Sequence, residues 1–215
     1  KRDDFEAVPY GENAAGDYNL KFGRIENGVH YFKISSVSGE CAICVPGNHN
    51  VRNACAAVAL VLELLKSDGK NPADYIEEIK SGLRKFSGGK RRSEIVGRTK
   101  TPLGQDVVFI DDYGHHPTAI KTTLAGFREF YKNHRIIVDF MSHTYTRTQA
   151  LLEEFASCFL SADDVIINRI YASARETASA SQVTGKILAE RAKKYHKSVF
   201  YAGEFEEAAE LSLNL

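Results

Sequence analysis

The sequence predicts an α/β protein whose C-terminal part is a doubly wound, mostly parallel sheet. From residue 93 onward, short apolar segments alternate with helical segments of a dozen residues or more. Strands that are joined by crossover helices run parallel, with helices on both faces of the sheet. Before residue 93 the pattern differs, because strands are followed by a run of helices. We therefore expect two unequal domains, residues 1–92 and 93–215.

The N-terminal domain begins with strands. Apolar and polar residues alternate on both sides of Asn27-Gly28, a dipeptide typical of a hairpin turn. Asn48 is a plausible cap for the first helix, and Asn71-Pro72 suits the start of the second, so both helices should pack on the same sheet. The strands are expected at 18–25, 29–35 and 41–45, and the helices at 51–66 and 72–85.

Four strand–helix units follow in the C-terminal domain. The strands are expected at 106–110, 135–140, 165–168 and 198–202, and the helices at 117–131, 147–160, 179–195 and 204–213. Three of these strands are followed by polar clusters, at 111–116, 142–147 and 169–176. Parallel strands end at one edge of the sheet, where ligands of open α/β sheets bind, so we expect these clusters to converge.

Composition restricts the partners. The chain has 28 Lys and Arg against 28 Asp and Glu, a formal net charge of +0, so we expect neither a nucleic acid nor a membrane partner. The apolar stretch 54–65 is shorter than the roughly 20 residues that span a bilayer, and residues 1–4 do not open a signal peptide. A cytoplasmic location is expected. The four cysteines lack a second Cys-x-x-Cys pair, so we expect structural thiols rather than disulfides or zinc.

The most informative segment is Asp-Asp-Tyr-Gly-His-His-Pro at 111–117, directly after an apolar strand. It could be a turn that caps the next helix, and Pro117 suits the first helical position. That role does not explain paired histidines beside paired aspartates, so we expect a binding or reactive site. The chain contains neither a Walker A loop nor Gly-x-Gly-x-x-Gly. Any main phosphate-binding site should therefore come from outside this chain.

Four segments together resemble the Mur ligases of peptidoglycan synthesis. Gly-Asn-His-Asn-Val-Arg-Asn-Ala at 47–54 looks like the family's Gly-x-His-Asn-x-x-Asn-Ala, and 86–92 looks like its arginine motif. The segment 111–117 matches the family's Asp-Asp-Tyr-Gly-His-His-Pro, and 140–148 is similar to its Phe-Gln-Pro-His-x-Tyr-Thr-Arg-Thr. The resemblance covers nearly the whole chain from about Asp17 and is strongest to the alanine-adding members.

The resemblance implies a piece of a three-domain enzyme. Residues 1–92 would be the end of the central ATPase domain, and 93–215 most of the Rossmann-like, amino-acid-binding C-terminal domain without its last strand. The UDP-binding domain and the Walker A segment would precede Lys1. ATP, with exchangeable Mg²⁺, would phosphorylate the lactyl carboxylate of UDP-N-acetylmuramate, and L-alanine would attack the acyl phosphate. The isolated chain should therefore be inactive.

The resemblance also implies roles for individual residues. The adenosine of ATP would contact His49, Asn50, Asn53, Asp112 and Tyr113. Arg92 would be a fixed cation that binds phosphate. The resemblance does not assign a role to its neighbour Arg91. The acyl phosphate and the alanine carboxylate would face His115, His143 and Arg147.

Other interpretations stay open. Met141-Ser142 replaces the family's Gln-Pro, and Thr144 stands where some members have arginine, so the choice of alanine over glycine or serine is not fixed. Tripeptide-adding Mur ligases have a similar histidine motif, but typically Phe-Ala in place of Tyr113-Gly114. A metal-dependent hydrolase would instead use a cluster of acids and imidazoles, drawn from Asp111, Asp112, His115, His116 and His143. A noncatalytic binding module is the third alternative, and on the ligase interpretation no metal site is expected in the chain itself.

Overall fold

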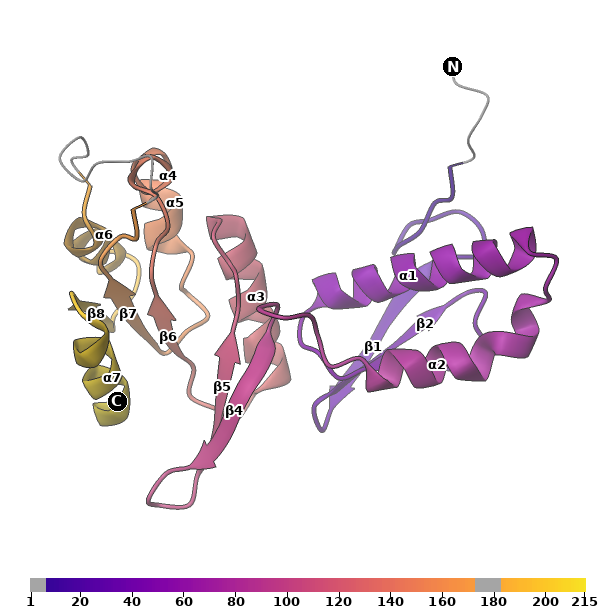
Figure 1. Cartoon of the computed structure of the whole chain (residues 1–215), viewed down its shortest axis with the longest axis horizontal. Coiled ribbons are helices and arrows are strands. Elements are labelled where there is room, and N and C mark those ends of the chain that lie inside the picture. The colour runs from indigo at the N-terminus through magenta and orange to yellow at the C-terminus, as the bar shows by residue number, and fades with distance from the viewer. Residues whose placement is uncertain (1–6, 173–182) are drawn as a thin grey trace. The chain divides into compact units, whose positions relative to one another are not determined.

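The computed structural model describes residues 7–172 and 183–215, and the chain divides into two compact units, Lys1–Asp112 and Tyr113–Leu215 (Figure 1). Each unit has its own apolar core. No helix in the described ranges is long and apolar enough to cross a membrane. The predicted boundary at 92/93 lies before the hairpin that ends the first unit and stays a prediction.

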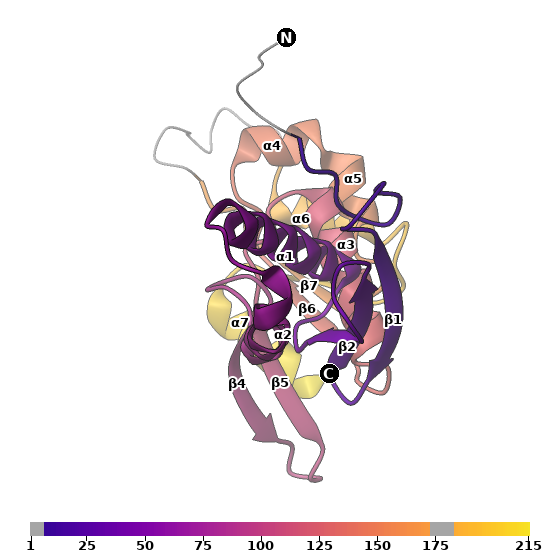
Figure 2. The ribbon, with the colours of Figure 1, turned by 90° about the vertical axis from the view of Figure 1, so that its right-hand side faces the viewer.

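The first unit contains an antiparallel sheet of three strands, β1 (Leu20–Glu26), β2 (Val29–Ile34) and β3 (Cys41–Ile43). The hairpin predicted at Asn27-Gly28 is confirmed, since Asn27 (φ 51°) and Gly28 (φ 72°) both have left-handed backbones. Two helices, α1 (Asn48–Ser67) and α2 (Ile76–Lys85), bury their apolar sides in the same core with this sheet, as expected (Figure 2).

The helix starts are partly as predicted. Asn71 accepts a hydrogen bond from the backbone N–H of Ala73 (3.3 Å) and caps a short 3₁₀ turn, η1 (Pro72–Tyr75), ahead of α2. The expectation that Asn48 caps α1 is wrong, because α1 begins at Asn48 and Gly47 occupies the cap position. Gly47 has φ 94°, a conformation that glycine adopts without the cost of a Cβ.

The first unit ends in a β-hairpin that the sequence did not reveal. β4 (Glu94–Lys100) pairs antiparallel with β5 (Asp106–Asp111) in a two-stranded sheet. The expectation that 106–110 joins the parallel sheet is therefore wrong. β4 was missed because its sequence, Glu-Ile-Val-Gly-Arg-Thr-Lys, is mostly polar and exposed, as suits a two-stranded ribbon.

The second unit is the predicted doubly wound α/β domain. Its parallel strands are β6 (Ile137–Phe140), β7 (Asp164–Asn168) and β8 (Val199–Ala202), in the order β6-β7-β8. The helices are α3 (Pro117–Phe130), α4 (Tyr145–Ala150), α5 (Leu152–Ser157), α6 (Gly185–Ala192) and α7 (Phe205–Asn214). The helix expected at 147–160 is broken at Leu151, and the start expected at 179 lies outside the described residues.

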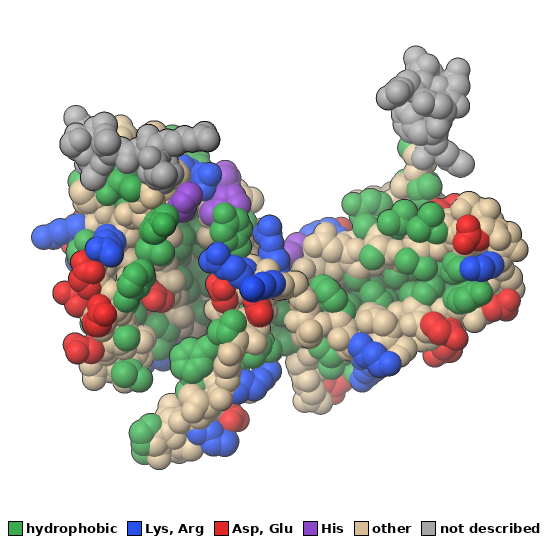
Figure 3. Space-filling view, in the orientation of Figure 1, with side chains coloured by type: hydrophobic (Ala, Val, Ile, Leu, Met, Phe, Trp, Pro, Cys, Tyr) green, Lys and Arg blue, Asp and Glu red, His purple; other side chains and the backbone are tan. Residues whose placement is uncertain are grey.

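Both faces of this sheet are covered by helices. Alternate residues of β7 point to opposite faces, and all five are buried. Val165 and Ile167 pack in the core that contains α5 and α6, whereas Ile166 packs with Ala208 of α7. Figure 3 shows histidine side chains gathered on the surface of this unit.

Candidate functional site

In the first unit, the candidate site residues begin at the start of α1. A Cβ on Gly47 would lie 2.6 Å from Cε1 of His49, so only glycine leaves room for the imidazole. Nδ1 of His49 is buried and has no hydrogen-bond partner among the described residues. Burial lowers the pKa of His49, Asp112 opposes this shift, and Arg52 adds to it. The partly buried His49 ring therefore favours its neutral form, and its Nδ1 packs against Gly47.

Asn50 and Asn53 lie three residues apart on α1, which places them on the same face of the helix. The amide of Asn50 donates to the carbonyl oxygen of Pro46 (2.8 Å), and this bond fixes its side chain. The side chain of Asn53 is exposed and forms no hydrogen bond with the described part of the chain. Arg52 between them is held away by Glu12, through two contacts of 2.8 Å.

Asp112 is held by a residue that the motifs did not indicate. The backbone N–H and hydroxyl of Ser93 donate to Oδ2 of Asp112, at 2.8 and 3.2 Å. Ser93 has φ 52° and is buried, so this tight turn fixes the carboxylate at the end of β5. No sequence signal identified Ser93, because a serine after two arginines has no characteristic pattern.

The two arginines before Ser93 differ. Nε of Arg91 forms an ion pair with Asp111 (3.1 Å), and its backbone N–H donates to Glu94 (2.7 Å). The backbone N–H of Arg92 donates to the carbonyl oxygen of Gly89 (3.0 Å), and its side chain is exposed. Arg91 thus has a structural role in the hairpin.

The segment after β5 combines a helix cap with exposed rings. His116 caps α3 by accepting from the N–H of Thr118 (3.3 Å), and Pro117 is the first helical residue, so the capping role weighed for this segment is correct for both. His115 and Tyr113 are exposed, with ring centroids 5.1 Å apart. Nδ1 of His115 donates to the carbonyl oxygen of Tyr113 (3.0 Å), which leaves Nε2 as the acceptor of the neutral ring.

The segment after β6 brings a second histidine and an arginine. Thr144 has φ 71° and caps α4, with its hydroxyl accepting from the N–H of Arg147 (3.4 Å). Nη1 of Arg147 donates to the carbonyl oxygen of His115 (3.5 Å). His143 is exposed and precedes the cap. The second unit therefore brings together His115 and Arg147, which lie 32 residues apart in the sequence.

The predicted convergence of three clusters is only partly correct. Asp111 is the last residue of the hairpin β4–β5 and Asp112 follows it, so neither follows a strand of the parallel sheet. Ser173, Arg175 and Glu176 of the third cluster lie outside the described residues, and Arg169 pairs with Glu204 (3.0 Å). Within the described ranges, no three His, Cys, Asp or Glu side chains are arranged to hold a metal ion.

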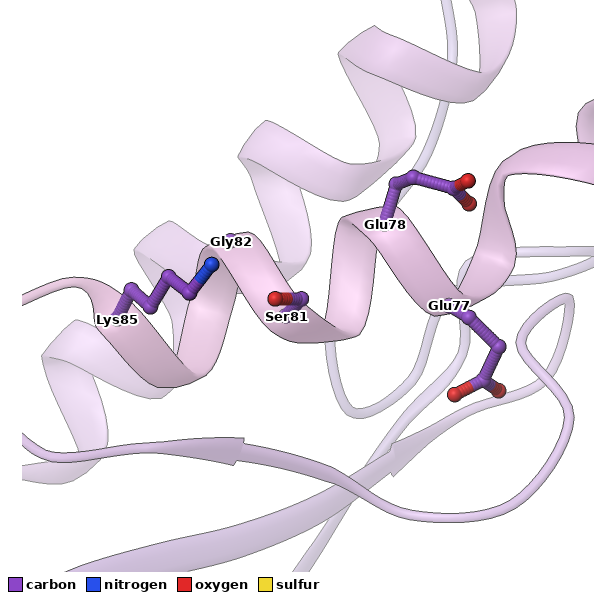
Figure 4. A pocket seen from close by; sticks show the side chains of 5 residues that line it. All are labelled: Glu77, Glu78, Ser81, Gly82 and Lys85. Atoms are coloured by element: carbon purple, nitrogen blue, oxygen red, sulfur yellow. The ribbon is translucent and has the colours of Figure 1, made fainter.

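A hollow of about 460 Å³ lies over α2, outside these motifs, and is lined by Glu77, Glu78, Ser81, Gly82 and Lys85. The side chains of Glu77 and Glu78 point in different directions rather than toward one point (Figure 4). The hollow is therefore a surface feature of an exposed helix.

Residues 91–215 match the family model described as "Mur ligase, glutamate ligase domain". The chain belongs to the Mur ligase family. Among curated relatives of this Mur ligase, the UDP-N-acetylmuramate–L-alanine ligase of Treponema pallidum (strain Nichols) is 44% identical over 201 residues, 93% of this chain and 40% of the relative. The ligase of the same name from Sulfurihydrogenibium sp. (strain YO3AOP1) is 36% identical over 98% of this chain and 42% of its own length.

Solved structures also share the fold of this chain. The crystal structure of UDP-N-acetylmuramate-alanine ligase from Thermotoga maritima has a TM-score of 0.65 and 26% identity, covering 92% of this chain and 40% of that one. A folylpolyglutamate synthase from Mycobacterium tuberculosis, complexed with ADP and AMPPCP, shares the fold with a TM-score of 0.63 at 16% identity, covering 93% of this chain and 41% of that one. This Mur ligase chain thus spans about two fifths of the length of these relatives.

Proposed function

We propose that this chain is part of an ATP-dependent ligase that joins L-alanine to UDP-N-acetylmuramate in peptidoglycan synthesis. The names of the relatives that match over most of the chain support this substrate pair. The observation that carries the proposal within the molecule is the contact between Arg147 and the His115 carbonyl oxygen (3.5 Å), which joins two of the motifs. A guanidinium is suited to bind a carboxylate or an acyl phosphate.

In this proposal the reaction has two steps. The lactyl carboxylate attacks the γ-phosphorus of ATP, which gives an acyl phosphate and ADP. The amino group of alanine then attacks the acyl carbon, and phosphate leaves as the amide forms. Such chemistry depends mainly on positioning and on neutralising charge. Arg147 and His143 would bind the anionic groups, and His115, whose Nε2 is an acceptor in the neutral ring, would face the incoming amine.

Most of the nucleotide contacts in the proposal, all except Tyr113, belong to residues of the first unit. His49 would contribute a partly buried ring that favours its neutral form, and Asn50 and Asn53 would offer amides on one helix face. Asp112, fixed by Ser93, would accept from the ribose hydroxyls, and the exposed side chain of Arg92 would meet phosphate. Tyr113, 47% exposed, offers a ring face to adenine.

Magnesium would enter this reaction with ATP and neutralise phosphate charge. The described residues provide no cluster of carboxylates that fits a resident ion, so no step of the proposal depends on protein ligands to Mg²⁺. Two of the metal ligands that a hydrolase would need have structural contacts instead, because Asp111 pairs with Arg91 and His116 caps α3. We keep the tripeptide-adding ligase as the second candidate, since the histidine motif alone suits both.

The proposal includes the organisation of the longer protein. We place the junction of the ATP-binding and amino-acid-binding domains at 92/93. Three residues close to this junction, Gly88 (φ 98°), Arg91 and Ser93, have left-handed backbone conformations. The missing UDP-binding domain and phosphate loop would be supplied by the rest of the protein, in the cytoplasm, where ATP and the UDP-sugar are found.

An isotope experiment on the longer protein tests the function. UDP-N-acetylmuramate labelled with ¹⁸O in the lactyl carboxylate should transfer one ¹⁸O to inorganic phosphate during alanine addition. Unlabelled phosphate would rule out the acyl phosphate. In parallel, alanine should be accepted and a peptidoglycan tripeptide refused; preference for the tripeptide would establish the second candidate instead.

A further inference from the structure

Tyr171, just beyond the end of β7, packs against His143. The phenol and imidazole rings are stacked, with centroids 5.5 Å apart and planes 19° apart. Tyr171 is 57% exposed, so its ring is not there to fill the core. It contacts His143, which is one of the proposed site histidines.

The backbone explains why these two rings meet. The N–H of Tyr171 donates to the carbonyl oxygen of Ser142 (2.8 Å), and the N–H of Thr144 donates to the carbonyl oxygen of Tyr171 (2.9 Å). His143 and Tyr171 are therefore partners in a parallel bridge. Partners on adjacent parallel strands point to the same face and lie about 4.8 Å apart. The residue type at position 171 thus decides what covers one face of the His143 imidazole.

Buried hydrogen bonds hold the backbone on either side of His143, but they do not hold its ring. Ser142 and Thr148 are buried and share a hydroxyl–hydroxyl hydrogen bond, and Thr148 donates to the carbonyl oxygen of Thr144 (2.7 Å). The imidazole of His143 forms no hydrogen bond within the described residues. The stack on Tyr171 is therefore a contact that can limit rotation of the ring.

We propose that Tyr171 is a positioning residue of the amide-forming site, which acts by holding the imidazole plane of His143. The inference rests on the proposed function, because it presumes that His143 takes part in ligation. A histidine that rotates freely spends less time in the productive orientation. Since aromatic stacking of this kind is modest in strength, its loss should slow the reaction about three- to tenfold.

A spectroscopic test uses the chain as it is. In ¹³C-histidine-labelled protein, the His143 ring protons, assigned with His143→Gln, should be shifted upfield by the ring current of Tyr171. Tyr171→Phe should preserve this shift and Tyr171→Leu should abolish it, while the other six histidine signals report that the fold is intact. Tyr201→Leu, at an exposed tyrosine of β8 with no ring contact to a histidine among the described residues, is the control. Equal His143 shifts in Tyr171→Leu and wild type would overturn the inference.

A kinetic test uses the longer protein. Tyr171→Leu should lower kcat about three- to tenfold without changing the KM for ATP, Tyr171→Phe should stay within about twofold, and Tyr171→Leu should add nothing to His143→Gln. If His143→Gln impairs ligation and Tyr171→Leu does not, only the positioning role fails. If His143→Gln keeps full activity, the site assignment fails and positioning is overturned with it.

Discussion

Arg147 is the charged side chain on which the second unit's part of the site depends most. It lies in the first turn of α4 and reaches the carbonyl oxygen of His115 rather than an acidic partner. Its charge is therefore not neutralised by a carboxylate among the described residues. Such a cation is suited to a ligand anion.

In the longer protein, Arg147→Ala should weaken use of alanine or the acyl-phosphate step by about 1.5–3 kcal/mol, the usual contribution of a hydrogen bond to a charged group. ATP binding should change little. Steady-state kinetics with each substrate varied would measure this, with Arg191→Ala, whose guanidinium pairs with Glu153, as the control. Unchanged turnover together with an unchanged alanine KM would remove Arg147 from the site.

The reactivity of each cysteine depends on whether its thiol is buried. All four are free, as expected, and only Cys44 is exposed. Burial raises the pKa of Cys41 to about 11 and that of Cys158 to about 12, and it also raises the pKa of Cys55. Since the thiolate is the reactive form, a thiol reagent at pH 8 should modify one cysteine rapidly in the native chain and four in denaturant. Rapid loss of more than one thiol, or any loss in Cys44→Ser, would contradict this expectation.

At the scale of elements, α6 approaches β7 very closely at Gly185. A Cβ there would lie 2.1 Å from the carbonyl oxygen of Asn168, which is a backbone atom that cannot move aside alone. Gly185→Ala should therefore lower the free energy of unfolding by about 1–3 kcal/mol. Gly203→Ala, whose added Cβ would have only ordinary contacts of 3.6 Å or more, should change it by less than about 0.5 kcal/mol. Urea denaturation of both variants would show whether the two differ.

A second element-scale prediction concerns Asp164, at the start of β7. Burial opposes its ionisation, but Arg135 (2.6 Å) and the hydroxyl of Ser198 (2.7 Å) outweigh burial, so the pKa of Asp164 lies below its usual value. A carboxyl whose pKa is lower in the folded than in the unfolded state stabilises the fold above its unfolded pKa of about 3.9, and this stabilisation is lost as the pH falls through the folded value.

Asp164→Asn should accordingly cost about 1–2 kcal/mol at pH 7, a modest figure because the Arg135 side chain is half exposed and screened. The difference from wild type should shrink below about pH 4. Urea unfolding at pH 7 and pH 3 would measure both values, and Glu190→Gln, in an exposed pair with Lys193, is the control. A difference that persists unchanged at pH 3 would show that packing rather than charge explains the loss.

At the scale of the whole molecule, the chain spans about two fifths of its relatives and contains no Walker A loop. We expect it neither to hydrolyse ATP nor to form the amide by itself, and to bind ATP weakly, because adenosine contacts without a phosphate loop provide only part of the affinity. Calorimetry and a phosphate-release assay would measure both. Submicromolar binding, or phosphate release that Asn50→Ala abolishes, would show that a phosphate site has been overlooked.

The sequence by itself determined the family, the doubly wound C-terminal unit and the local structure at Asn27-Gly28 and Pro117. These features depend on residues close together in the chain, whose turn chemistry and apolar period are visible in any stretch of sequence. The motifs also identified the candidate residues, because their types and spacing are unusual together.

Only the tertiary structure decided which of these residues meet. It paired β5 with the polar strand β4, anchored Asp112 on Ser93, brought Arg147 to His115 and stacked Tyr171 on His143. Apart from the β4–β5 hairpin, whose strands are neighbours in the chain, each contact joins segments that are distant in sequence, and each depends on strand pairing and burial rather than on local preference. Apolar periodicity indicates that a strand exists but does not specify its partner, so these contacts could not be derived from the sequence alone.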